Sequence, residues 1–155
     1  MQLQLINWTE AMSVDGGQID NTHRNLISLI NRLHLIVNHA ADCDSVSNIL
    51  CELADYTGAG FLVEEKVMIL SKYNERDQHV AHHWEFIDCL TNIIADFERG
   101  REVGNDLLIF LVHWVASHIR NNDQQFGLFL RGGTRRQLNG RLRREGAQIE
   151  ASRGR

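Results

Sequence analysis

Proline is absent from all 155 residues of this sequence. Helix interiors exclude proline because its ring removes a backbone donor and clashes with the preceding turn. Strand-like alternation of apolar and polar residues is also scarce, so the sequence predicts an all-α fold. The chain length suits one domain with a core large enough to fold alone.

Long apolar runs are missing as well. No stretch of about 18 apolar residues occurs, which argues against a membrane span or a membrane partner. The first residues, MQLQLINWTE, lack the basic and apolar segments of a secretory signal. Cysteine is sparse, because Cys43, Cys51 and Cys89 are odd in number and form no CxxC pair. These absences predict a cytoplasmic protein with free thiols.

Charge is divided unevenly along the chain. Residues 1–130 hold 8 Lys and Arg against 18 Asp and Glu, whereas residues 131–155 hold eight arginines against Glu145 and Glu150. We therefore divide the chain into a domain of residues 1–130 and a basic tail or linker of residues 131–155. The acidic domain favours a cation, and the tail has no aromatic residue for base stacking, which argues against a nucleic-acid partner. A signalling partner bound through the tail stays open.

Four amphipathic segments are predicted from apolar residues spaced three and four apart, and they cover residues 20–40, 45–71, 76–98 and 105–121. Asp20 or Asn21 is expected to cap the first of them. Short connections between the segments predict an up-down-up-down four-helix bundle. An N-terminal arm, residues 1–18, is expected to pack over this bundle, and the Arg-rich tail follows it.

On each of the four segments, the apolar face that would point into the bundle also carries polar side chains, although leucine would be less costly to bury there. A single buried histidine is usually a core residue bonded to a carbonyl group. Here, however, the polar residues lie at alternating helix ends that meet at one end of an up-down bundle. They are His23, Glu64, His79, His83 and His118.

Burial of that set calls for a positive centre, because each group needs a partner away from water. His79 and His83 lie four residues apart and can chelate one ion from one helix face. Asp123 lies five residues beyond His118, after two asparagines where a loosened helix would direct it inward. Imidazole and carboxylate ligands without thiolate suit iron, manganese or zinc. The number of ligands favours two ions bridged by oxygen.

Five pieces of the sequence together resemble a bacterial hemerythrin, and they cover residues 6 to about 130. In order they are NWTEAMSV, IDNTH ending at His23, YTGAGFLVEE, HVAHH ending at His83, and HIRNND ending at Asp123. The resemblance implies a cytoplasmic protein that binds dioxygen for carriage, storage or sensing. It also implies a non-haem di-iron centre, with two iron ions joined by an oxo or hydroxo bridge.

The ligand set comes from the same resemblance. It comprises the three histidines of one iron, two bridging carboxylates and a histidine of the other iron, namely His79, His83, His118, Glu64, Asp123 and His23. In the family a second histidine of that other iron stands four residues before the bridging glutamate. Gly60 occupies this position here, so a ligand position is vacant. We expect an imidazole-sized void beside it, with room for about two or three waters of roughly 30 Å³ each.

The vacancy leaves three outcomes open for the second ion. Water or a small exogenous ligand completes it, the position stays empty and one metal remains, or another side chain such as His82 swings in.

The resemblance also implies an oxygen pocket over the open iron, formed by Trp114, Val115 and Ile119, although any bundle fills such positions with apolar residues. Glu65, next to the bridging glutamate, is expected on a solvated face.

Three functions follow from this interpretation. The leading one is binding of dioxygen or peroxide without turnover, because no nucleophile, base or substrate cleft is evident beside the metals. The first alternative is peroxidase-like or oxygenase-like activity at the iron that Gly60 opens. The second is an oxygen or redox input domain of a signalling protein, with the tail of residues 131–155 leading to the output.

Overall fold

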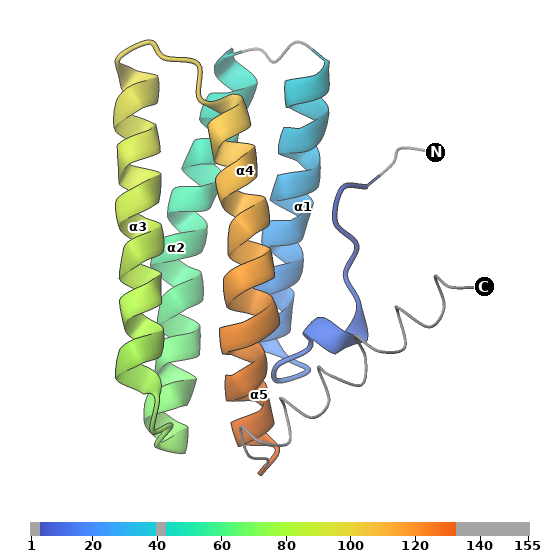
Figure 1. Cartoon of the computed structure of the whole chain (residues 1–155), viewed down its shortest axis with the longest axis vertical. Coiled ribbons are helices and arrows are strands. Elements are labelled where there is room, and N and C mark those ends of the chain that lie inside the picture. The colour runs from blue at the N-terminus through green and yellow to red at the C-terminus, as the bar shows by residue number, and fades with distance from the viewer. Residues whose placement is uncertain (1–3, 40–42, 133–155) are drawn as a thin grey trace, which may run out of the picture.

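A computed structural model describes residues 4–39 and 43–132, and it contains four rods that run alternately up and down (Figure 1). The rods are α1 (Gln18–Asn38), α2 (Cys43–Ser71), α3 (Arg76–Glu98) and a fourth made of α4 (Gly104–Trp114), the π-helical segment η2 (Val115–Asp123) and α5 (Gln124–Leu130). No strand occurs in these two ranges. The predicted all-α, up-down-up-down bundle is therefore confirmed. No helix of the described residues is long and apolar enough to cross a membrane.

The fourth rod is longer than the sequence pattern predicts. An end at residue 121 is wrong, because Asn121 and Asn122 do not stop the helix but lie within η2, and the rod continues to Leu130. The end comes at Gly132, whose positive φ of 72° permits the turn and whose N–H donates to the Phe129 carbonyl at 2.9 Å. The predicted basic tail lies almost wholly outside the described residues.

The start of α1 differs from the expected cap. Asp20 and Asn21 both lie inside the helix, which begins at Gln18. The capping carboxylate belongs instead to Asp15, which accepts the N–H groups of Gly17 at 2.8 Å and Ile19 at 3.1 Å. These are N–H groups that a helix start leaves without an internal partner.

Asp20 has a different role, because its buried carboxylate organises the loop before α1. It accepts the hydroxyl of Ser13 at 2.6 Å and the backbone N–H groups of Val14 at 2.7 Å and Gly16 at 3.1 Å. Burial acts to raise the pKa of Asp20, but these hydrogen bonds outweigh it and hold the pKa below its ordinary value. The carboxylate therefore fastens the end of the arm to the bundle.

The arm packs as the sequence predicts. Met12 and Val14 are each only 2% exposed, and they cover the bundle near the start of α1. Higher up, the backbone of Ile6 exchanges two hydrogen bonds with the Asn31 side chain, at 3.0 and 2.8 Å. The arm therefore runs along the outer side of α1 (Figure 1).

Two apolar clusters fill the bundle at different heights. The larger one occupies most of its length and includes Leu26, Phe61, Phe86 and Trp114. The smaller one closes the lower end in Figure 1 and comprises the buried residues Val14, Ile19, Met68, Tyr73 and Phe126. Along the chain, His23 lies between Ile19 of the smaller cluster and Leu26 of the larger one, and Glu64 lies between Phe61 of the larger and Met68 of the smaller. The fold thus places a polar layer between two apolar ones.

We predict that Asp20→Asn lowers the free energy of unfolding of the metal-free protein by about 1–3 kcal/mol at pH 7, because buried donors lose their acceptor. A lowered native pKa means that this stabilisation is present above the ordinary value of 3.8 and is lost as pH falls through the native value. The difference between parent and variant should therefore shrink at pH 3. Denaturant titrations at both pH values measure it. The exposed Asp88→Asn serves as the control, and an equal difference at both pH values would contradict the assignment.

Candidate metal centre

The six predicted ligands meet at one height of the bundle, and we call this set the polar layer. Each residue is at most 4% exposed, and every rod contributes at least one of them: His23, Glu64, His79, His83, His118 and Asp123. Side chains from residues 23 to 123 of the sequence are thus brought together in the core. The predicted convergence of these residues is therefore present in the structure.

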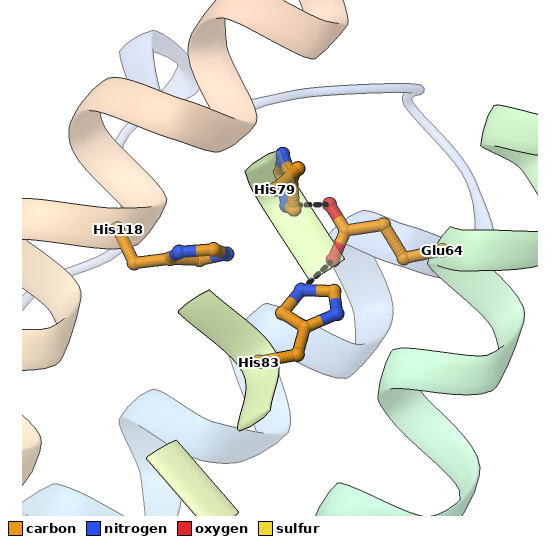
Figure 2. A group of neighbouring side chains, drawn as sticks. All are labelled: Glu64, His79, His83 and His118. Carbon is orange, nitrogen blue, oxygen red and sulfur yellow. Dashed lines mark ion pairs between the residues drawn. The ribbon is translucent and has the colours of Figure 1, made fainter. Parts of the chain in front are cut away.

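One group of the layer contains three histidines and a carboxylate. Figure 2 shows Glu64 reaching from α2 toward the rings of His79 and His83 on α3, with His118 approaching from the fourth rod. One ligand atom from each lies within 4.8 Å of the others. The Glu64 oxygens lie 3.7 Å from His79 Nε2 and 3.4 Å from His83 Nε2. Four donors from three rods thus surround one point.

A second group shares Glu64 with the first. His23 and Asp123 complete it, again with ligand atoms within 4.8 Å of one another. Asp123 Oδ2 lies 3.2 Å from His23 Nε2, whereas Oδ1 lies 3.0 Å from His79 Nε2 and 3.1 Å from His118 Nε2. The two carboxylates therefore stand between the groups, one oxygen of Asp123 toward each.

The π-helical segment explains how the fourth rod supplies two of these residues. Hydrogen bonds in a π-helix join residues five apart, so side chains at i and i+5 share a face. His118 and Asp123 have this separation and both lie in η2, from Val115 to Asp123. In an α-helix the same spacing would turn Asp123 away from His118. The loosening predicted near the two asparagines therefore extends over the whole segment.

Ligand atoms of the layer are buried without hydrogen-bond partners in the described part of the chain. They are Glu64 Oε1, His79 Nε2, His83 Nε2, His118 Nε2 and both oxygens of Asp123. Each such atom left unpaired costs on the order of 1–3 kcal/mol, and a cation shared among them removes that cost. Oxygen and imidazole nitrogen donors suit a first-row metal ion. The residues present therefore fit metal ions at both groups.

The electrostatics of the layer differ from one ligand to the next. Burial, together with the charges of His79 and His83, lowers the pKa of His118 to about 4 despite the opposing effect of Asp123, so its ring is neutral at pH 7 with a lone pair available. Burial and the charge of Asp123 raise the pKa of Glu64. Burial acts on Asp123 in the same direction, but His118 and His23 outweigh it and bring its pKa well below the ordinary value. Asp123 is thus ionised more readily than Glu64.

Aromatic rings fix two of the histidines. Phe61 stacks on His83 with ring centroids 4.0 Å apart and planes within 3°. Trp114 stacks on His118 in the same way, at 4.0 Å and 11°. Trp114, one of the three expected oxygen-pocket residues, therefore lies against the three-histidine group. The other two, Val115 and Ile119, are 2% and 0% exposed, and all three belong to the larger apolar cluster.

Glu65 was missed by the sequence pattern, and the prediction of a solvated position for it is wrong. Its carboxylate lies 2.8 Å from His83 Nδ1, with the side chain 26% exposed. This contact leaves His83 Nε2 to face the layer, and carboxylates of this kind orient histidine ligands and strengthen their binding. The clue available in the sequence was that position 65 lies at the edge of the α2 face that packs on α3.

Gly60 does not border the void expected there. A Cβ atom at this position would lie 2.7 Å from the Thr22 methyl group and 3.4 Å from the Tyr56 ring. The threonine methyl and the tyrosine ring thus take up the space. Thr22 is followed on α1 by His23, which belongs to the second group, so Gly60 packs on α1 next to a residue of that group. His82 contacts Asn122 and belongs to neither group.

We predict that Glu65→Ala weakens binding of zinc, a redox-silent probe ion, by about 10- to 100-fold, because His83 loses the acceptor that orients its ring. Glu65→Gln keeps an acceptor and should lie between parent and alanine variant. Competition with a chelating dye measures the dissociation constants. Glu52→Gln, an exposed change on the same helix, is the control, and equal affinities for all four proteins would contradict the role.

Comparison with known proteins agrees with the site. The Hemerythrin HHE cation binding domain matches residues 17–128. The bacteriohemerythrin of Pseudomonas aeruginosa is 30% identical over 116 residues, which cover 75% of each chain. That of Stenotrophomonas maltophilia is 27% identical over 124 residues, 80% of each chain, and that of Methylococcus capsulatus is 26% identical over 127 residues, 81% of this chain and 96% of the relative. The chain therefore belongs to the hemerythrin family of cation-binding domains.

Proposed function

We propose that this protein holds two iron ions in the polar layer and binds dioxygen or peroxide at the second one, for carriage, storage or sensing in the cytoplasm. The observation that carries this proposal is the set of buried nitrogen and oxygen atoms, without hydrogen-bond partners in the described part of the chain, that form two groups around a shared glutamate. When bound, a pair of iron(II) ions supplies two electrons to dioxygen. The family supports iron as the metal.

The two ions would have different numbers of histidine ligands. His79, His83 and His118 would hold the first ion, and Glu64 with Asp123 would join it to the second. Only one imidazole, from His23, belongs to the second group, so positions there stay open to an exogenous ligand. Apolar clusters lie on both sides of the layer along the rods and limit the entry of water from the two ends of the bundle.

Peroxidase-like activity is a second candidate, favoured by a surface groove. The groove has a volume of about 360 Å³, runs between α3 and the fourth rod, and reaches His118 and Trp114 from the solvent side. Phe86 and Phe110 contribute an apolar lining that suits an organic reductant. The signalling role inferred from residues 131–155 depends on a segment that lies almost wholly outside the described part.

We predict that the combined variant Thr22→Ser and Gly60→His retains iron better than the parent. The histidine adds a donor to the second group, and the serine removes the methyl group that would collide with the new Cβ. Iron per chain, counted after a timed challenge with a chelator, measures retention. The parent should lose its second iron first, while the variant should keep close to two.

The controls separate position 60 from a general effect of added histidine. Gly58→His places the same side chain on the same helix, where nothing lies within 4 Å of a Cβ. Thr22→Ser alone tests the loss of the methyl group. If the combined variant retains no more iron than either control, position 60 does not serve the second ion.

For the peroxidase candidate we predict turnover of an oxidisable dye by hydrogen peroxide at a rate per iron well above that of free iron. The reason is that dye in the groove would lie next to His118. Absorbance of the oxidised dye measures the rate. A rate equal to that of free iron leaves reversible ligand binding as the function.

A further inference from the structure

The space around position 60 is occupied by a tyrosine. Tyr56 lies one helical turn before Gly60 on α2, and two carbons of its ring lie 3.4 and 3.5 Å from where a Cβ of residue 60 would stand. Side chains four residues apart share a helix face, so Tyr56 is on the same side of α2 as Gly60 and Glu64. The ring thus lines the part of the bundle from which an imidazole is missing.

The surroundings of Tyr56 hold its ring in place. Its ring meets Phe61 at a centroid distance of 5.7 Å and Phe86 at 6.3 Å, both in edge-to-face geometry. Such contacts between aromatic rings restrict the ring plane. Phe61 in turn stacks on His83, so the ring that positions a metal ligand also positions the tyrosine.

Tyr56 is partly buried, and its hydroxyl group lies near Trp114, the ring that stacks on His118. Asp123 and Glu64, the carboxylates that stand between the two metal groups, also act electrostatically on this hydroxyl. A phenol hydroxyl can donate one hydrogen bond and has the reach of a long side chain. Because an indole N–H only donates, the contact with Trp114 leaves the Tyr56 O–H able to donate to a ligand in the layer.

We propose that the Tyr56 hydroxyl donates a hydrogen bond to a small anionic ligand bound at the second metal position, the one formed by His23, Glu64 and Asp123. This inference rests on the proposed function, since it requires a metal ion in the second group. Without a side chain at position 60, the tyrosine ring is the α2 group next to the open side of that group. It orients the incoming ligand and stabilises its charge.

The chain provides a matched control in its other tyrosine. Tyr73 lies at the closed end of the bundle, where its ring packs on Phe126 and Phe129 with centroids 4.9 and 5.0 Å away. Its nearest ring in the polar layer is that of His79, at 6.5 Å. Tyr73→Phe thus removes an equivalent hydroxyl from the other side of the layer.

The test uses the iron-loaded ferric protein and sodium azide, a small anion that changes the visible absorption of iron(III). We expect Tyr56→Phe to raise the azide dissociation constant about tenfold or more, as loss of a hydrogen bond to a charged ligand does. Tyr73→Phe should stay within about twofold of the parent. Iron content and thermal unfolding, measured on the same samples, show whether each variant folds and loads normally.

A second readout separates hydrogen bonding from packing. The infrared stretching frequency of bound azide should shift in heavy water for the parent and for Tyr73→Phe, but not for Tyr56→Phe. If Tyr56→Phe matches the parent in affinity and in isotope response while both hold two irons, the inference is wrong and the proposed function stands. A parent protein that holds no iron in the second group or binds no azide overturns both.

Discussion

Burial of six coordinating side chains in one layer is the constraint on which the rest of the structure depends. Nitrogen or oxygen atoms of all six residues lie in the core without hydrogen-bond partners in the described part of the chain. Apolar clusters lie on both sides of them along the rods. A cation shared among these atoms would compensate many lone pairs at once, so burial of the layer links the stability of the bundle to metal binding.

Different structural features orient the ligand side chains on the different rods. The fourth rod widens to a π-helix, which turns His118 and Asp123 to one face. Phe61 and Trp114 stack on two of the imidazoles, so those rings lose little further freedom on binding a metal. Glu65 fixes which nitrogen of His83 faces inward. Together they preorganise the ligands before an ion arrives, which lowers the cost of binding.

The two metal groups are chemically unequal. The first has three imidazoles and a carboxylate, whereas the second has two carboxylates and one imidazole, with a tyrosine ring beside the glycine. In the proposed function, the group with fewer nitrogen donors would be the one that holds its ion less firmly and exchanges small ligands.

The sequence by itself determined the fold class, the number of rods and the six residues of the polar layer, because apolar spacing is a local property. It did not determine the end of the fourth rod, which runs to Leu130 and not to residue 121. Local signals could not show that Glu65 would reach His83 or that Asp15 would replace Asp20 as the cap. They also could not show that Thr22 and Tyr56 would fill the space beside Gly60. These contacts join residues whose separation depends on how the rods pack and how the loops run. Only the tertiary structure decides such distances, since the same helices at another rotation would bring other side chains together.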